Sequence, residues 1–435
     1  MKPYPAYKNP SLPWAERIPT GWNAFPNIAL FDERIERGFQ DRELLAVTIT
    51  RGVIRQTELE DNRDGSNEDK WAYKRVCPGD LAYNKMRMWQ GAVGYSQFEG
   101  IVSPAYIVLK PKRRLNAKFF HYLFRTPLYI KESYRNSYGI CDDMLSLRYF
   151  DFKRMWSILP PEQEQDAIVD FLEAKDRDIQ TFIANKRRMI ELLKEQKAAL
   201  INRAVTRGLN PKAPIQPSGI PWLGDIPAHW EIKRMKRIGR IRYGLGQPPR
   251  LKDDGIPMLR ATNIDCGEIL EKDLLHVDPD DIPRDRNPFL RQGEILVVRS
   301  GALTADSAIV PSRFAGALAG YDMVLTATKA DASFVSYALL SDYLQSKQLH
   351  LLKLRAAQAH LNTEELGGAL VLLPKSIEEQ KLIASFLSVQ KGQIAHAIDT
   401  AEREIALMEE YRTALIAAAV TGKMDVRQAT VPEPN

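Results

Sequence analysis

Two stretches of the sequence end on a basic residue that directly precedes a polar loop. GDLAYNK at 79–85 ends on Lys85, and GEILVVR at 293–299 ends on Arg299. Their apolar runs are typical of strands, so each basic side chain would stand at the end of a strand. Lysine and arginine in such a place donate hydrogen bonds to guanine edges or to DNA phosphates. A surface salt bridge is the equally favoured alternative for either residue.

Other polar side chains near these loops offer similar chemistry. The loop after Lys85 reads MRMWQGAVG, the loop after Arg299 reads SGALTADS, and RYGLGQPPR at 242–250 adds glycines that allow a ligand to approach the backbone closely. Glutamine can bond adenine through two hydrogen bonds, and arginine can do the same with guanine. The further candidates for DNA contact are Arg87, Trp89, Tyr138, Arg148, Arg242, Gln247, Arg250, Ser300, Thr304, Arg355, Gln358 and His360.

The sequence lacks the residue patterns of catalytic centres that act on DNA. It has neither the Asn/Asp-Pro-Pro-aromatic loop of base-nitrogen methyltransferases nor a GxxxxGK[ST] phosphate loop. Its 6 histidines and 3 cysteines show no zinc-ligand spacing. Asp278, Asp280 and Asp281 cluster, but an acidic turn is the commoner meaning of such a group. We therefore predict a chain with no catalytic residue, no metal site and no cofactor of its own.

Length and charge set broad limits. A chain of 435 residues is too long for one ordinary core, so two to four structural units are expected. The 61 basic and 55 acidic residues give a net charge of +6, which is compatible with nucleic-acid binding without requiring it. No apolar run is long enough to span a membrane, and the first residues lack a signal-peptide core. Few, scattered cysteines fit reduced thiols, so a cytoplasmic location is predicted.

The strongest feature is an internal repeat. PWAERIPTGW at 13–22 returns as PWLGDIPAHW at 221–230, and the two strand-like stretches described above match each other. Phe119 and Tyr122 match Phe334 and Tyr337. The segment 164–206 matches 379–421 without a gap. The chain is therefore arranged as variable domain, helix, variable domain, helix.

The two matched end segments are predicted to be long helices with a coiled-coil seam. Apolar residues recur at alternating steps of four and three, which places them on one side of a helix. About 45 residues make a rod of roughly 65–70 Å, too long to bury its seam within one small domain. The rod's expected partner is the other rod; two isolated helices, each packed on its own domain, are the alternative. The seam residues are Leu172, Ile179, Ile183, Ile190, Leu193, Leu200, Leu387, Ile394, Ile398, Ile405, Met408 and Leu415, with Lys186, Lys197 and Arg412 as polar departures.

Helix ends and domain boundaries follow from turn residues. Pro160 and Pro161 suit the opening turn of the first helix, Ser376 and Glu379 have capping-box spacing, and glycines at 208 and 422 suit helix ends. The predicted boundaries are domain 1 at 1–160, helix 1 at 161–209, domain 2 at 210–373, helix 2 at 374–424 and a flexible tail at 425–435. Within the domains we predict strands at 44–49, 80–85, 106–110, 294–299 and 322–328, and short helices at 119–125 and 333–340.

This layout resembles the specificity subunit of type I restriction–modification enzymes over nearly the whole chain. The resemblance depends on the doubled PW…IP..W opening, the Gly-Asp/Glu-apolar strand, the Pro…Glu-Gln…Phe-Leu start of each long helix, and the endings LINRAVTRG and LIAAAVTGK. It implies an α+β fold in which two target-recognition domains of mixed strands and short helices are separated by two long antiparallel helices that form a coiled coil, with an internal pseudo-two-fold repeat. The first copy lacks the glycine of the second copy's opening (SLPWAER against SGIPWLGD), so the geometry there is less defined.

The resemblance also implies a function and partners. Each domain would read one half of a split, asymmetric target in double-stranded DNA, and the helices would set the gap and dock two methyltransferase (modification) subunits. S-adenosylmethionine would bind to those subunits, and ATP with Mg²⁺ to motor/endonuclease (restriction) subunits. Two alternatives stay open: a coiled-coil scaffold that binds only proteins, and a DNA-modifying enzyme with unrecognised motifs.

Overall fold

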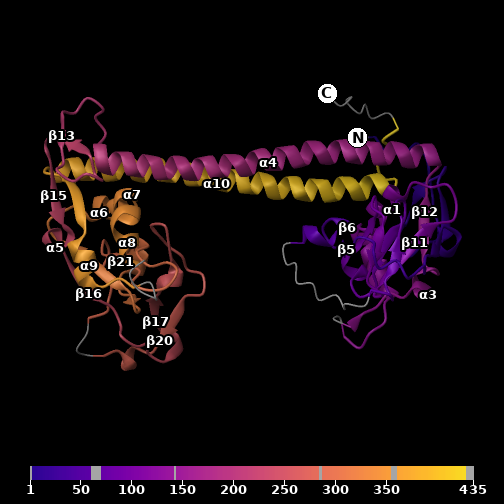
Figure 1. Cartoon of the computed structure of the whole chain (residues 1–435), viewed down its shortest axis with the longest axis horizontal. Helices are drawn as coiled ribbons and strands as arrows, with labels where there is room; N and C mark the ends of the chain where they lie inside the picture. Colours follow the sequence, from indigo (N-terminus) through magenta and orange to yellow (C-terminus); the bar gives the residue numbers. More distant parts are fainter. Residues whose placement is uncertain (1, 60–69, 142–143, 284–286, 354–359, 428–435) are drawn as a thin grey trace. The chain divides into compact units, whose positions relative to one another are not determined.

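The computed structural model describes residues 2–59, 70–141, 144–283, 287–353 and 360–427. The chain forms two compact units: unit 1 comprises residues 1–186 and 403–435, and unit 2 comprises residues 187–402. Two long helices, α4 (Glu162–Arg207) and α10 (Ile377–Val420), each contribute one part to unit 1 and the other part to unit 2 (Figure 1). The predicted boundaries separate the helices from the domains, whereas the contacts assign each part of a helix to the unit on which it packs.

Each unit contains a four-stranded antiparallel sheet, and the two sheets have equivalent strand orders. The order is β4-β11-β8-β9 in unit 1 and β16-β24-β21-β22 in unit 2. The strands of unit 1 are β4 (Phe31–Glu33), β8 (Leu81–Asn84), β9 (Val93–Tyr95) and β11 (Tyr106–Pro111). Those of unit 2 are β16 (Gly239–Tyr243), β21 (Ile295–Val297), β22 (Ser307–Ile309) and β24 (Met323–Ala327). The two matched strand-like stretches of the sequence thus form equivalent inner strands, β8 and β21.

The remaining elements are partly repeated. In each unit a strand after the opening tryptophan pairs with the strand before the long helix, and a short helix packs in the core. The repeated elements are β3 (Asn23–Pro26), β12 (Trp156–Leu159) and α1 (Ala117–Phe124) in unit 1, and β15 (Trp230–Arg234), β25 (Leu370–Pro374) and α6 (Ala332–Leu339) in unit 2. Elements without such a counterpart include β5 (Leu45–Thr48) and β6 (Gly52–Arg55) in unit 1, and β17 (Leu251–Leu259), β18 (Ile264–Asp265), β19 (Glu268–Ile269), β20 (Leu275–Val277) and β23 (Leu318–Ala319) in unit 2.

Matched residues make matched contacts. Trp22 packs edge-on against Phe119 with ring centroids 6.2 Å apart, and Trp230 packs against Phe334 at the same separation. The repeated glutamine near the start of each long helix is also used alike.

In unit 1 the side chain of Gln165 donates to Pro160 O and accepts from Asn116 N, both at 2.8 Å. In unit 2 Gln380 donates to Pro374 O and accepts from Asp331 N, again both at 2.8 Å. Both glutamines are 2% exposed, so their hydrogen bonds join each long helix to its domain at a buried point.

The sequence-predicted elements are confirmed in type and place. The five predicted strands correspond to β5, β8, β11, β21 and β24, and the two predicted short helices correspond to α1 and α6. The glycines that end the long helices have left-handed backbones, with φ of 74° at Gly208 and 72° at Gly422. Ser376 accepts from Glu379 N at 3.4 Å, but the Glu379 carboxylate bonds to Trp230 Nε1 instead of completing the capping box.

The two long helices pack against each other, and they do so antiparallel. In unit 1, Arg412 of α10 pairs with Asp176 of α4, and Lys186 Nζ lies 2.5 Å from Glu404 Oε2. The contacting residue numbers rise along one helix as they fall along the other. Two of the three polar departures on the predicted seam therefore make cross-helix ion pairs.

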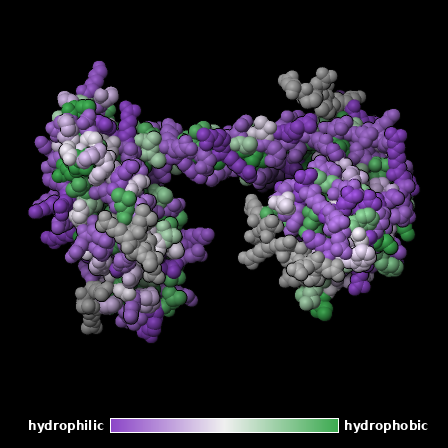
Figure 2. Space-filling model, viewed as in Figure 1, coloured by the Kyte–Doolittle hydropathy of each residue, from purple (hydrophilic) through white to green (hydrophobic). Residues whose placement is uncertain are grey.

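The burial of the long helices agrees with the predicted seam. All twelve of its residues are buried or half-buried, and the fully buried ones include Leu172, Ile183 and Leu387 at 2–3% exposure. Apolar residues off the seam, such as Leu382 and Leu407, are more than 60% exposed. Figure 2 shows scattered hydrophobic residues on the otherwise largely hydrophilic visible face of these helices. The alternative of two isolated helices does not fit these contacts.

The start of the expected flexible tail is packed. Val426 is 3% exposed within the core of unit 1, and Asp425 N donates to Lys2 O at 3.0 Å. The rest of the expected tail, 428–435, lies outside the described residues. Among the helices that the structure describes, none combines the length and apolar character needed to cross a membrane.

Candidate nucleic-acid interface

Arg299 follows β21 and is held at its backbone from two sides. Its amide donates to Asp322 Oδ1 at 3.2 Å, and its carbonyl accepts from Leu361 N at 2.7 Å. Burial raises the pKa of the Asp322 carboxyl to about 6, against the hydrogen bond and charge of Arg299. Asp322 is 3% exposed, so it acts as a buried support for the arginine backbone.

The Arg299 guanidinium lies over two aromatic rings. Its Cζ atom is 4.5 Å from the ring centroid of Tyr243 and 4.3 Å from that of Tyr321, distances typical of cation–π contacts. Its Nη2 lies 2.9 Å from His360 Nε2. Because arginine stays protonated, Arg299 is the donor and that histidine nitrogen is the acceptor. The sequence-predicted residues Arg299 and His360 are thus brought together.

A cavity of about 250 Å³ adjoins this arginine. Tyr321 and Asp322 line it together with Ser300 and Gln247, two residues predicted from sequence. Gln247 is exposed and Ser300 is half-buried. Unit 2 therefore gathers Gln247, Arg299, Ser300 and His360 around one surface, while Arg355 and Gln358 lie outside the described residues.

Two other residues of unit 2 that were predicted to contact DNA, Arg242 and Thr304, form hydrogen bonds within the protein. Arg242 forms a two-pronged ion pair with Glu294 at 2.6 and 2.8 Å, and also donates to Phe289 O at 2.9 Å. Burial raises the pKa of Glu294, but bonds from Arg242 and other donors outweigh it, and the pKa lies below its ordinary value. Thr304 is 2% exposed and donates to Gly301 O. These contacts favour a structural role for Arg242 and Thr304.

Arg250 is exposed and lies beside an acidic turn. Its guanidinium is 3.8 Å from Asp278 and 3.6 Å from Asp281. Asp278 also accepts from Asp280 N, a bond that lowers the pKa of the Asp278 carboxyl. The expected acidic turn is therefore present, and Arg250 is part of its charge balance.

In unit 1, the carbonyl of Lys85 is held like that of Arg299, whereas its amide donates to the backbone oxygen of Ala105 and not to a carboxylate. Its carbonyl accepts from Leu147 N at 2.8 Å, just as the Arg299 carbonyl accepts from Leu361 N. Its side chain is half-buried and forms no ion pair in the described part of the chain. Lys85 and Arg299 are thus equivalent in place, as their sequence match predicts, but they differ in side-chain surroundings.

The loops next to Lys85 present both polar and apolar side chains. Arg87 is exposed and donates to Gln90 at 3.2 Å, while Trp89 Nε1 donates to Met86 O at 3.0 Å. Tyr138 is 68% exposed, and its backbone pairs with that of Ser146. Arg148 is exposed and precedes α3 (Tyr149–Phe152). The neighbouring Ile140 is 96% exposed.

Sequence reasoning missed three residues that shape the surface of unit 2. Tyr243, Tyr321 and Asp322 surround Arg299, but the last two follow it by more than 20 residues and belong to no recognisable motif. Tyr243 directly follows Arg242, and sequence reasoning named only the charged member of that pair as a candidate. Aromatic spacing gives no signal for such a long-range contact.

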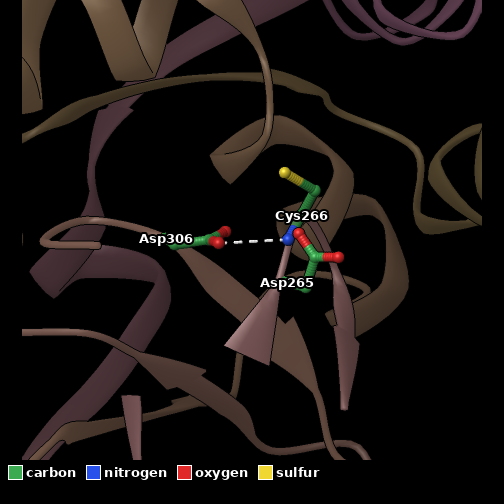
Figure 3. A group of neighbouring side chains, drawn as sticks. All are labelled: Asp265, Cys266 and Asp306. Carbon is green, nitrogen blue, oxygen red and sulfur yellow. Dashed lines mark hydrogen bonds between the residues drawn. The ribbon is translucent and has the colours of Figure 1, made fainter. Parts of the chain in front are cut away.

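One group of side chains has the composition of a metal site. Asp265, Cys266 and Asp306 place possible ligand atoms within 4.8 Å of one another (Figure 3). The Asp306 carboxylate, however, accepts from Cys266 N at 3.0 Å and from Ser307 N at 2.7 Å, as the dashed line in Figure 3 shows for the first bond. Burial and the two carboxylates raise the pKa of the Cys266 thiol, which disfavours the thiolate that a metal requires. The backbone hydrogen bonds of Asp306 explain why these three side chains lie together, so we interpret the group as a structural turn.

Comparison with known proteins agrees with this architecture. No protein-family model matches the chain. The type I restriction enzyme EcoKI specificity subunit of Escherichia coli (strain K12) is 19% identical over 330 residues, which cover 73% of this chain and 68% of that protein.

Two solved structures share the fold. One, from a study of complex assembly and conformational transition of the type I R-M system, has a TM-score of 0.70 at 15% identity and covers 94% of this chain and 99% of its own. The HsdS subunit from Thermoanaerobacter tengcongensis has a TM-score of 0.55 at 15% identity, with 94% and 98% covered. This chain is thus homologous to the EcoKI specificity subunit, and it has the fold of these two solved structures.

Proposed function

We propose that this chain is the DNA sequence-specificity subunit of a type I restriction–modification enzyme and reads a split, asymmetric target with one domain per half-site. The observation that carries the proposal is a duplicated frame that holds different loops. The inner strands β8 and β21 end at equivalent residues, Lys85 and Arg299, whose carbonyls accept equivalent hydrogen bonds. The loops beyond them, 86–92 and 300–306, have the same length but differ in chemistry, which suits two unlike half-sites.

The side chains offered to DNA differ between the units. Unit 1 presents Arg87, Tyr138 and Arg148 on exposed loops beside Lys85. Unit 2 presents Gln247, Ser300 and the aromatic-flanked Arg299. Arginine and glutamine can read base edges, and exposed lysine and arginine can also set the register through phosphates. Arg242 and Thr304 are the weaker candidates for DNA contact in this proposal, because their side chains form hydrogen bonds within the protein.

The long helices are the proposed spacer and docking site. A helix of 46 residues such as α4 is about 69 Å long at ~1.5 Å per residue. Exposed apolar residues on α10 supply surface for partner proteins; they include Leu382, Phe386 and Val389 in unit 2 and Leu407 and Tyr411 in unit 1. We assign this surface to two methyltransferase subunits that bind S-adenosylmethionine. Restriction subunits that use ATP and Mg²⁺ would complete the enzyme in the cytoplasm.

Exchanging one domain tests the assignment of half-sites. Residues 1–160 would be replaced by the corresponding domain of another specificity subunit, and methylated adenines would be mapped in host DNA carrying the complete system. We expect one half of the methylated motif to change while the other half and the gap stay the same. A change in both halves would contradict the division of labour between the domains.

Lengthening both helices tests the spacer. Seven residues inserted after Lys186 and seven after Arg403, on facing helices of unit 1, preserve the heptad pattern and add about 10 Å. At ~3.4 Å per base pair this corresponds to a gap about three base pairs longer. Seven residues inserted in the loop after Gly208 are the matched control, because they leave both helices unchanged. An unaltered gap in the helix variant would refute the spacer role.

The two rival functions predict different biochemistry. A DNA-modifying enzyme would cut or methylate DNA when the pure chain is incubated with Mg²⁺ and S-adenosylmethionine, and we expect neither product. A protein-only scaffold would not bind DNA. We expect DNA binding, measured in the presence of methyltransferase subunits, to weaken with rising salt as phosphate contacts are screened.

A further inference from the structure

Arg299 differs from the other arginines of unit 2 in how its charge is used. Arg242 is paired with the buried Glu294, and Arg250 lies beside Asp278 and Asp281. Among the described residues, the Arg299 guanidinium forms no ion pair with a carboxylate, and Asp322 bonds to its backbone amide instead. A charge that forms no direct ion pair but is held in place is suited to an acceptor outside the protein.

The guanidinium is held in place by neutral groups. The rings of Tyr243 and Tyr321 lie 4.5 and 4.3 Å from its Cζ atom, and His360 accepts from Nη2 at 2.9 Å. The Tyr243 ring is itself anchored, because its hydroxyl accepts from Thr363 N at 3.1 Å. Aromatic faces stabilise the cation without occupying the N–H groups in its plane. The side chain therefore loses little further rotamer freedom when it binds a ligand.

The position of the Arg299 guanidinium determines which of its N–H groups can donate to a ligand. Its Nε atom is buried and has no hydrogen-bond partner among the described residues, whereas the residue as a whole is half-exposed. Nη2 gives one of its two hydrogens to His360. The remaining donors of Nη1 and Nη2 form a planar fork, which matches two coplanar acceptors. Guanine presents such a pair, O6 and N7, in the major groove.

We propose that Arg299, set between Tyr243 and Tyr321, reads a guanine in the half-site recognised by unit 2. This inference rests on the proposed function and adds the base and the residue that reads it. A cavity of about 250 Å³ is lined by Tyr321, which contacts the Arg299 guanidinium, and by Ser300 and Gln247.

Unit 1 provides an internal contrast. Lys85 occupies the equivalent backbone position, but no aromatic ring lies over its ammonium group in the described part of unit 1. Lysine is also a point charge without a planar fork. The rigid arginine is thus a property of unit 2 alone, and only that half-site should depend on it.

The experiment combines protein variants with altered bases. The target is first identified with the wild-type complex of this chain and its methyltransferase subunits, by selection from randomised duplexes. Each guanine of the unit 2 half-site is then replaced in turn by 7-deazaguanine, which lacks the N7 acceptor. Binding is measured for the wild type, Arg299→Ala, Arg299→Lys and Tyr321→Leu, with Arg250→Ala as the matched control.

We expect one guanine to be sensitive in the wild type. Because 7-deazaguanine keeps the O6 acceptor, its loss in affinity should be smaller than the roughly 5- to 150-fold in Kd of a whole two-pronged arginine–guanine contact. Arg299→Ala should lose that larger factor and show no further loss at that guanine. Arg299→Lys and Tyr321→Leu should each lose part of the discrimination at that guanine. Arg250→Ala should keep the wild-type pattern, and retained discrimination at the other base pairs of the unit 2 half-site shows that unit 2 of each variant is folded.

The failures are distinguishable. If the wild-type complex selects no split sequence, the proposed function fails. If it selects one but Arg299→Ala weakens binding to all sequences equally, Arg299 contacts phosphate and the guanine assignment is overturned. A full additional loss with 7-deazaguanine in Arg299→Ala, or a unit 2 half-site without guanine, overturns it as well.

Discussion

Replacing Arg242 should destabilise unit 2 locally, because this arginine neutralises a buried carboxylate. The Glu294 side chain is 6% exposed and receives two guanidinium hydrogen bonds at 2.6 and 2.8 Å. In Arg242→Ala the carboxylate would keep its bonds from Thr326 Oγ1 and Arg291 N but lose its counter-ion. We therefore expect the sheet that contains β16, β21 and β24 to open more readily.

The structure gives the magnitude. Breaking a buried ion pair by removing one partner typically costs about 3–5 kcal/mol. The Arg242 side chain is 29% exposed and Glu294 retains two donors, so we take about 2–4 kcal/mol here after allowing for solvent screening. At ~1.4 kcal/mol per factor of ten, this corresponds to amide exchange about 30- to 700-fold faster in β16 and β24.

Hydrogen–deuterium exchange of the full chain, followed by mass spectrometry, measures this effect strand by strand. The equivalent strands β8 and β11 of unit 1 serve as an internal control and should be unaffected. Arg250→Ala is the matched surface control, because its side chain is 75% exposed, and exchange should change by no more than about fivefold. Unchanged exchange in β16 and β24 of Arg242→Ala, together with lost DNA affinity, would refute the structural role and restore Arg242 as a DNA contact.

Three further predictions concern pH, backbone strain and the helix pair. Burial raises the pKa of Asp322 to about 6, so the folded state binds the carboxyl proton more tightly than the unfolded state does. Between pH 4 and 7 the free energy of unfolding of unit 2 should therefore fall by up to about 3 kcal/mol in the wild type relative to Asp322→Asn. Parallel plots of Tm against pH for the two proteins would contradict this. Gly422→Ala should lower the Tm more than Gly208→Ala, because a Cβ would meet a proline ring atom at 2.4 Å at the first site and a tryptophan ring atom at 3.3 Å at the second, although both backbones have positive φ. Asp176→Asn should destabilise unit 1 by about 1 kcal/mol at low salt, because Arg412 loses its ion-pair partner. The difference in stability should shrink as salt screens the charges. An effect that does not depend on salt would indicate lost packing instead.

The repeated strands and long helices could be predicted from the sequence, because they occur twice in the chain and depend on the pattern of apolar residues. Burial imposes the seven-residue seam of the long helices and the apolar runs of strands such as β8 and β21, so these features are visible without any knowledge of distant contacts. The repeated glutamines Gln165 and Gln380 were recognisable as matched residues, but their shared hydrogen bonds became evident only in three dimensions.

The surface offered to DNA was only partly predictable, because chemically identical residues differ in their partners. Arg242 is the last residue but one of β16 and Arg299 lies just after β21, and nothing in the neighbouring sequence shows which of the two is paired within the protein. Arg242 meets Glu294, a carboxylate 52 residues away, whereas Arg299 meets two tyrosine rings. Which arginine remains available is decided by these long-range contacts and not by the loop sequence around it.

The charges on the seam favour the antiparallel arrangement over the parallel one. Lys197 and Arg412 occupy equivalent positions of the repeat, so a parallel pairing in register would place these two cations side by side within the seam. The antiparallel pairing instead brings Arg412 to Asp176 and Lys186 to Glu404. It also inserts the end of α10 into unit 1, where Leu415, Ala419 and Val420 complete the core around Trp22. Residues that interrupt the apolar seam thus help to select the helix direction on which each unit's core depends.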